Sequence, residues 1–207
     1  MSKARLVKAV FISLAALAAA GFVAAAAAQT PPAVGDPAPA FTLKCLSGTD
    51  HSLADLKGKI VVLEWTNPGC PVVQRHYQDG LMPAAQKAAR KKGAVWFAVN
   101  STNPGHNNYR EPADLRTTYT GWQAAYNTQL MDADGATGQA YGAKTTPHII
   151  VIDAQGKIAY NGAIDDDTSG SKADRTNYAL AAIDALIAGQ PVAVTTTRPY
   201  GCSVKYK

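Results

Sequence analysis

Apolar runs without a polar face alternate with amphipathic stretches through most of this chain. Two β-branched runs, 59–65 and 94–99, are typical of strands buried in a parallel sheet. Shorter strands are predicted at 41–43, 128–131, 148–153 and 158–164. The pair Gln155-Gly156 lies between the last two and predicts a hairpin turn, so that these two strands pair antiparallel.

Helical periodicity fills the intervals between the predicted strands. Helices are predicted at 71–92, with an interruption near Gly80, and at 112–126, 136–141 and 176–188. Alternating strands and helices imply parallel pairing, and the final hairpin adds antiparallel strands. The sequence therefore predicts an α/β fold, with one central mixed sheet flanked by helices and no internal repeat.

The first 28 residues have the pattern of an export signal. Their basic residues are Lys3, Arg5 and Lys8. An alanine-rich apolar run follows and ends in small residues before Gln29. We expect a signal peptide, residues 1–28, that is cut after Ala28; the alternative is an uncleaved membrane anchor. The mature protein is then periplasmic or secreted, and it meets a membrane only through the signal peptide.

Composition divides the rest of the chain into three segments. Residues 29–35 are rich in proline and predict an extended lead-in. Residues 36–190 contain all the predicted strands and helices and form the expected domain. Residues 191–207 form a tail that is predicted to be irregular and that carries Cys202.

The charge balance gives no argument for a nucleic-acid partner. The formal net charge is +5, from 20 Lys and Arg against 15 Asp and Glu. Three of the basic residues lie in the predicted signal peptide, which leaves 17 against 15 in the mature chain. No basic patch with interleaved aromatic residues remains, and we expect no nucleic acid among the partners.

The three cysteines are Cys45, Cys70 and Cys202, and all follow the predicted signal peptide. An exported protein can form disulfides, and an odd number leaves at least one thiol over. Cys70 follows a buried strand and precedes Pro71, which suits the first position of a helix. A helix N-terminus favours a thiolate, which is the nucleophilic form of cysteine. The alternative interpretation of Cys70 is a small buried apolar residue.

The strand, the cysteine turn and a later Thr146-Pro147 together resemble the thioredoxin fold over about residues 36–190. The quoted segments are Trp65-Thr66-Asn67-Pro68-Gly69-Cys70-Pro71-Val72-Val73, Thr145-Thr146-Pro147-His148 and the final Pro-Tyr-Gly-Cys-Ser-Val-Lys-Tyr. More closely, they resemble peroxiredoxin-like redoxins of the alkyl hydroperoxide reductase and thiol-specific antioxidant superfamily, in one exported bacterial subgroup. This resemblance implies an enzyme, a thiol-dependent oxidoreductase with antioxidant or disulfide-exchange activity, and no cofactor.

The residues around Cys70 depart from both reference motifs. Thioredoxin-type exchange uses a second cysteine three residues after the first, where this chain has Val73. Peroxiredoxins carry Thr or Ser three residues before their reactive cysteine, where this chain has Asn67. The substrate is therefore left open between a peroxide and a protein or small-molecule disulfide. In either case an external thiol reductant is the expected second partner.

Cys202 is the expected resolving residue for Cys70, because a distant thiol can close a two-cysteine site. The alternatives are a structural Cys45–Cys202 bond or a bond to another chain, and Cys45 is otherwise expected to be passive.

A second interpretation of the whole chain is a non-enzymatic redox-sensing or binding module. The two interpretations differ in whether Cys70→Ser abolishes turnover or leaves partner binding intact.

The resemblance also names residues that would contact a substrate. It implies that Thr146-Pro147 is cis, faces Cys70 and pairs with a substrate, while Trp65 and Pro71 border the cysteine. His148 is close enough in sequence to Pro147 to approach Cys70. One cysteine and one histidine make a poor metal signature, and we expect no metal. Side chains around His76 and the acidic loop 165–167 are expected to face solvent.

Overall fold

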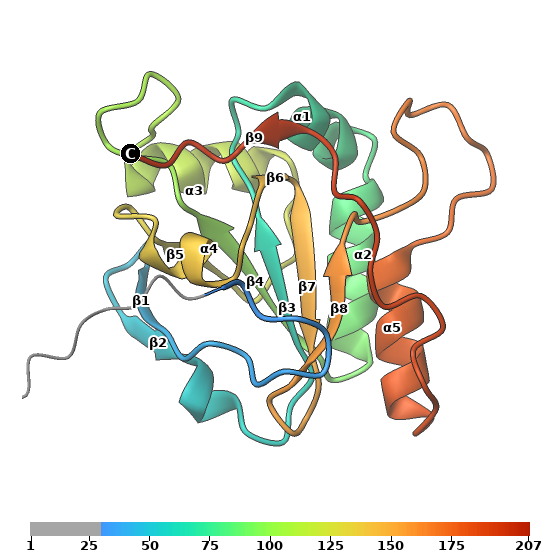
Figure 1. Ribbon diagram of the computed structural model, residues 1–207. Helices are drawn as coiled ribbons and strands as arrows, with labels where there is room; N and C mark the ends of the chain where they lie inside the picture. The colour runs from blue at the N-terminus through green and yellow to red at the C-terminus, as the bar shows by residue number, and fades with distance from the viewer. Residues whose placement is uncertain (1–29) are drawn as a thin grey trace, which may run out of the picture.

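Seven strands form one mixed sheet in the computed structural model, which describes residues 30–207 (Figure 1). They are β1 (Thr42–Cys45), β2 (Asp50–Ser52), β3 (Val61–Trp65), β4 (Val95–Asn100), β5 (Thr128–Met131), β7 (His148–Ile152) and β8 (Ile158–Gly162). Their order is β2-β1-β5-β4-β3-β7-β8. The central strands β3, β4 and β5 run parallel, and the remaining neighbours pair antiparallel. The predicted α/β fold with a central mixed sheet is confirmed.

Five α-helices and one 3₁₀ turn surround the sheet in the described part of the chain. They are α1 (Pro71–Gln78), α2 (Leu81–Lys91), α3 (Pro112–Gly121), α4 (Ala136–Ala140), α5 (Tyr178–Ile187) and the 3₁₀ turn η1 (Leu53–Leu56). The predicted interruption near Gly80 is confirmed, because this residue has a left-handed φ of 75°. The prediction that α3 extends to residue 126 was wrong. The helix ends at Gly121, and the chain turns at Gln123, which has a φ of 55°.

Two apolar layers lie on opposite faces of the sheet. Along β3, Val62 packs with the helices α1, α2, α3 and α5, whereas Leu63 packs with the layer that contains Tyr141. This alternation follows from the two-residue period of a strand. Both side chains are fully buried. The strand therefore holds its carboxyl end, where Cys70 follows, rigidly between two packed layers.

Both ends of the described chain add to the sheet structure. The backbone N–H of Gly35 donates to Ile158 O at 2.8 Å, so that the proline-rich lead-in lies along β8. The tail was predicted to be irregular, which was wrong for two residues. They form β9 (Cys202–Ser203), which pairs antiparallel with β6 (Thr145–Thr146). Figure 1 shows β9 in red beside β6 and the start of α1, at one end of the sheet.

The predicted signal peptide, residues 1–28, lies outside the described residues. Within residues 30–207, no helix combines the length and the apolar composition that crossing a membrane requires.

Candidate active site

Cys70 occupies the junction between β3 and α1. It is the N-cap residue of α1, with φ −91° and ψ 120°, and Pro71 begins the helix. The turn before it is built by Asn67, whose Oδ1 accepts a hydrogen bond from the Gly69 N–H at 2.7 Å. The Cys70 side chain caps no backbone group of the helix and is 1% exposed. Its thiol donates to Thr146 O at 3.0 Å. The sulfur is therefore aimed across the site and not along the helix.

The loop opposite Cys70 contains the predicted cis peptide. The Thr146-Pro147 bond is cis, and both residues are buried. Thr146 belongs to β6, and its carbonyl oxygen is the acceptor of the Cys70 thiol. The sequence prediction that this loop faces Cys70 therefore agrees with the observed contact.

Cys202 reaches the same point from the C-terminal tail. It is the β-pair partner of Thr146, whose Oγ1 donates to Cys202 O at 3.4 Å. The preceding Gly201 has a φ of 124°, and a Cβ on it would overlap the Thr146 carbonyl oxygen. Only glycine permits this close approach. The result is that Cys202 lines the same small cavity as Cys70 and packs against the apolar layer that contains it, and no disulfide joins the two.

The two thiols have opposite acidities. Burial raises the pKa of Cys70, but hydrogen bonds from the Cys202 side chain and the Val73 and Cys202 backbone outweigh it and lower the pKa overall. Burial, the hydrogen bond to Cys70 and the charge of Cys70 raise the pKa of Cys202 to about 11, against a smaller opposing effect of Lys205. Because the pKa of Cys70 is lowered and that of Cys202 is raised, Cys70 is the thiol that ionises first.

A very small cavity lies beside the two sulfurs. Its volume is about 10 Å³, which is roughly the space for one water molecule. Its lining residues are Thr66, Asn67, Cys70, Ser101, Thr102, Asn108, Thr146, Cys202, Ser203, Val204 and Lys205. The tail supplies the last four of these residues. The tail therefore forms one wall of the site and leaves no room for a substrate in this conformation.

Trp65 and Pro71 do not line this cavity. Trp65 is fully buried below it and donates from Nε1 to Ser101 Oγ at 3.1 Å. Pro71 is exposed on the outer side of Cys70. Trp65 is thus placed to support the cavity wall through Ser101, and Pro71 is placed to meet a partner at the surface.

His148 lies close in sequence to the cis peptide, but both of its ring nitrogens are engaged elsewhere. Nδ1 accepts from the Lys144 N–H at 3.0 Å, and Nε2 lies 2.7 Å from Asn161 Oδ1. Burial lowers the pKa of His148. The ring is therefore neutral near pH 7 and makes no hydrogen bond to Cys70.

Cys45 lies apart from the other two cysteines. It belongs to the apolar layer that contains Leu63, whereas Cys70 belongs to the opposite layer, against which Cys202 packs. Its sulfur lies 3.0 Å from Ser47 Oγ. Burial acts to raise the pKa of Cys45. Hydrogen bonds with Ser47, His51 and Thr49 have the larger, opposite effect and lower the pKa to about 6. The structure thus brings Cys202 together with Cys70 and not with Cys45.

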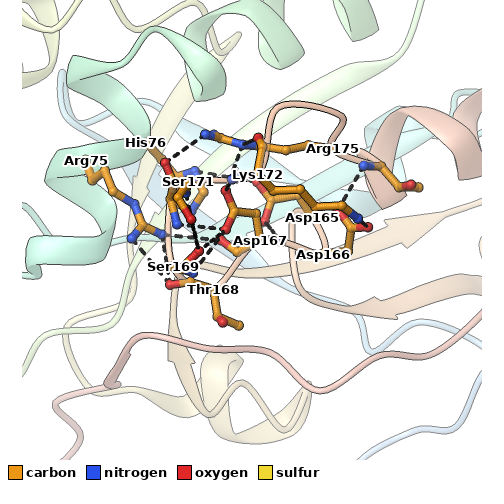
Figure 2. Close-up of polar contacts among 12 residues, drawn as sticks. Arg75, His76, Asp165, Asp166, Asp167, Thr168, Ser169, Ser171, Lys172 and Arg175 are labelled. Carbon is orange, nitrogen blue, oxygen red and sulfur yellow. Dashed lines mark hydrogen bonds and ion pairs between the residues drawn. The ribbon is translucent and has the colours of Figure 1, made fainter.

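The expectation that His76 and the acidic loop face solvent was wrong for His76, Asp165 and Asp167, while Thr168 and Ser169 are exposed. His76 is 1% exposed, and Asp165 and Asp167 are 5% and 3% exposed. Figure 2 shows the loop folded against Arg75 and His76 of α1, with Arg175 beside Asp167. Asp167 accepts several N–H groups of its own loop, a pattern that the following Ser and Gly residues favour. Pairing inside the fold removes these charges from solvent, and sequence periodicity carries no signal of it.

Glu64 is a buried carboxyl group within an apolar run, where the sequence pattern gives no signal for it. It lies in β3 and is fully buried. The Tyr77 hydroxyl donates to its Oε1, and Gln86 Nε2 and Trp96 Nε1 donate to its Oε2, each at 2.8 Å. Burial raises its pKa despite these hydrogen bonds. Within residues 30–207, no group of three His, Cys, Asp or Glu residues is arranged to hold a metal ion.

Comparisons with known proteins agree with this geometry. The chain is 31% identical to the thiol-disulfide oxidoreductase ResA of Geobacillus thermodenitrificans over 159 residues, which are 74% of this chain and 84% of that protein. It resembles the structure of an uncharacterised conserved protein from Geobacillus kaustophilus with TM-score 0.76 and 25% identity, over 84% and 93% of the two chains. It also resembles a putative thiol:disulfide interchange protein DsbE from Chlorobium tepidum with TM-score 0.51 and 27% identity, over 62% and 84%. The redoxin family matches residues 33–180, and the chain belongs to that family.

Proposed function

We propose that this protein is a thiol-disulfide oxidoreductase in which Cys70 is the nucleophile and Cys202 is the resolving thiol. The observation that carries the proposal is that Thr146, at the cis Thr146-Pro147 bond, accepts the Cys70 thiol and is the β-pair partner of Cys202. The similarity to the thiol-disulfide oxidoreductase ResA supports disulfide exchange as the reaction.

The reaction follows from the order in which the two thiols ionise. The Cys70 thiolate attacks one sulfur of a substrate disulfide, forms a mixed disulfide and releases the other sulfur as a thiolate. Cys202 then loses its proton and attacks the Cys70 sulfur, which releases the reduced substrate and leaves a Cys70–Cys202 disulfide. An external dithiol reduces this bond and is itself oxidised. The substrate gains two electrons, and the dithiol supplies them.

The high pKa of Cys202 suits the second step. Burial raises the pKa of Cys202 to about 11, together with the hydrogen bond to Cys70 and the Cys70 charge. Once Cys70 is part of a mixed disulfide, its negative charge is gone and can no longer raise the pKa of Cys202. Attack by Cys202 is therefore favoured only after the substrate has bound covalently.

Peroxide reduction remains the second candidate reaction. Cys70 would then be oxidised to a sulfenic acid by a peroxide, and Cys202 would condense with it and release water. The polar side chains of Thr66, Asn67 and Thr102 in the wall of the small cavity beside Cys70 could bond to the oxygens of a peroxide once the tail moves aside. Antioxidant activity would follow from this reaction.

Reduction of insulin disulfides by the mature protein, with an excess dithiol reductant, tests the proposal. We expect turnover that Cys70→Ser abolishes, that Cys202→Ser reduces while trapping a mixed disulfide, and that Cys45→Ser leaves unchanged. Hydrogen peroxide consumption faster than that of a free thiol, without insulin reduction, would overturn disulfide exchange in favour of the peroxidase. If neither reaction occurs and partner binding survives Cys70→Ser, the chain is a redox-sensing or binding module.

We further propose that the protein is exported and acts in the periplasm or outside the cell. The basic residues and the alanine-rich run of residues 1–28 support this proposal. The mass of the protein recovered from the periplasm of an expressing bacterium tests it. We expect a chain that starts at Gln29, and a full-length chain in the cytoplasm would contradict the proposal.

A further inference from the structure

The residue Tyr200 lies two positions before Cys202 and ties the tail to the body of the domain. We call residues 199–206 the strap. The Tyr200 hydroxyl donates a hydrogen bond to Asp165 Oδ1 and lies 3.0 Å from His76 Nε2. Since the hydroxyl proton is directed to the carboxylate, His76 Nε2–H is the donor to the Tyr200 oxygen. The three side chains form one connected chain of hydrogen bonds.

This chain of hydrogen bonds is enclosed by protein. His76 and Asp165 are 1% and 5% exposed, and Tyr200 is half-buried. His76 Nδ1 lies 3.9 Å from Asp165 Oδ2 and has no hydrogen-bond partner. An unpartnered Nδ1 agrees with a neutral ring whose proton is on Nε2. Burial lowers the pKa of His76, which also favours the neutral ring. Burial and the neighbouring Asp165 raise the pKa of Tyr200, so that its hydroxyl remains a donor.

The position of Asp165 is itself fixed by the loop that follows it. The Asp167 N–H donates to Asp165 Oδ1 at 3.1 Å, and Asp167 pairs with Arg175 at 2.9 Å. From α1, Arg75 donates to the Thr168 carbonyl oxygen at 3.3 Å. Figure 2 shows this loop held between Arg75 and Arg175. The acceptor for Tyr200 therefore belongs to a loop that is bonded to α1 through Arg75 and to Arg175.

The strap is held on both sides of Cys202. On one side is Tyr200, and on the other the Tyr206 hydroxyl donates to Ala143 O at 2.9 Å while Lys205 O accepts from the Asn103 N–H at 2.8 Å. Between these anchors the strap covers Cys70, which is 1% exposed. A substrate disulfide cannot reach the Cys70 sulfur in this arrangement. The strap has to move aside for the first attack and return for the second.

We propose that Tyr200, Asp165 and His76 form a latch that closes the strap over Cys70 and returns Cys202 to it. Tyr200 is then a positioning residue, which acts through Cys202 and does not touch the reacting sulfurs. Because His76 is in the helix that begins after Cys70, the latch fixes the strap to the element that holds the nucleophile. This inference rests on the proposed roles of Cys70 and Cys202. It adds that closing the strap slows the first step and speeds the second.

The test measures both steps in one reaction. Reduced protein with Cys45→Ser is mixed with an aromatic disulfide that releases a coloured thiolate. The disulfide is limited to one equivalent, so the first coloured thiolate reports attack by Cys70 and the second reports resolution of the mixed disulfide by Cys202. With Tyr200→Phe we expect the first phase to accelerate and the second to slow, each by roughly tenfold, as the loss of one charge-assisted hydrogen bond permits. Tyr126→Phe is the matched control, since it removes a hydroxyl that bonds to Gln129 Oε1 at 3.0 Å.

Variants of the carboxylate separate a latch from a general loss of stability. Asp165→Asn keeps an oxygen acceptor for Tyr200, and we expect both phases to stay near those of the parent protein. Asp165→Ala removes the acceptor, and we expect the same opposed changes as with Tyr200→Phe. A Tyr200→Phe protein with parental rates in both phases would overturn the latch, and so would a parallel change in both phases. If the parent protein itself shows no second phase, the resolving role of Cys202 fails instead.

Discussion

Thr146 and Cys202 face each other across the antiparallel pair of β6 and β9, and the Thr146 carbonyl oxygen also accepts the Cys70 thiol. A single residue next to the cis peptide therefore contacts both cysteines of the site. Backbone pairing sets the position of Cys202, while the helix junction sets that of Cys70. The second thiol that Val73 cannot supply in the helix is thus supplied from the tail.

The first prediction concerns the acidity of Cys70. The hydrogen bond from Cys202 is the largest of the effects that lower the Cys70 pKa. Cys202→Ala removes this donor, so we expect the pKa of Cys70 to rise. The rate of iodoacetamide labelling of Cys70 as a function of pH measures it, with mass spectrometry of the Cys70 peptide. Cys202→Ser keeps a hydroxyl donor and is expected to raise the pKa less. An unchanged Cys70 pKa in Cys202→Ala would show that the helix N-terminus alone is responsible.

The second prediction concerns the close approach of the tail to the cis peptide. Gly201→Ala places a Cβ against the Thr146 carbonyl oxygen at a φ that disfavours alanine. We expect β9 to be displaced and the Cys70–Cys202 disulfide to form more slowly by roughly tenfold, a barrier increase of about 1.4 kcal/mol. Rapid mixing with an oxidant, followed by acid quenching and mass analysis, measures the rate.

A glycine outside the site provides the control for this variant. A Cβ on Gly121 would meet no atom within 4 Å, and the residue lies in α3. Gly121→Ala is therefore expected to leave the rate of disulfide formation unchanged and to stabilise the protein by up to about 1 kcal/mol. Equal rates in the parent protein and Gly201→Ala would contradict the importance of the close approach.

The third prediction concerns the pH dependence of stability. Burial raises the pKa of Glu64 above its value in the unfolded chain. The folded state therefore binds this proton more tightly, and the associated stability is present at low pH and is lost as the pH rises through the folded pKa. Glu64→Gln removes this titration while keeping an oxygen for Trp96 Nε1. Urea unfolding at a series of pH values is expected to show a smaller fall in the free energy of unfolding for the variant. Parallel curves for the two proteins would contradict the prediction.

The fourth prediction concerns the support below the cavity. Ser101 Oγ accepts from Trp65 Nε1 at 3.1 Å and donates to Asp132 Oδ2 at 2.5 Å, and all three residues are buried. Ser101→Ala leaves the indole N–H without a partner. We expect a loss of about 1–3 kcal/mol in the free energy of unfolding. Denaturant unfolding measures it, and the control is Ser171→Ala, a substitution at an exposed serine after the acidic loop. A change below about 0.5 kcal/mol would show that water replaces the hydroxyl.

The sequence by itself determined the order of the longer strands and of the α-helices, because apolar periodicity and Gly and Pro positions report directly on local structure, but it did not show the short strands β2, β6 and β9. It also determined the turn that carries Cys70, since a buried strand followed by Cys70-Pro71 specifies a helix N-terminus. The end of α3 at Gly121 was not predicted, because a polar helix end has little periodic signal.

Only the tertiary structure decided which thiol meets Cys70. Cys202 is far from Cys70 in the sequence, and its position depends on pairing with Thr146 and on the close contact of Gly201. The burial of His76 and Asp165 was decided in the same way, by a hydrogen bond to Tyr200. Apolar periodicity shows which face of a single helix or strand is buried. Contacts between a tail, a loop and a helix give no periodic signal, because each contacting side chain is a single polar residue in its own segment.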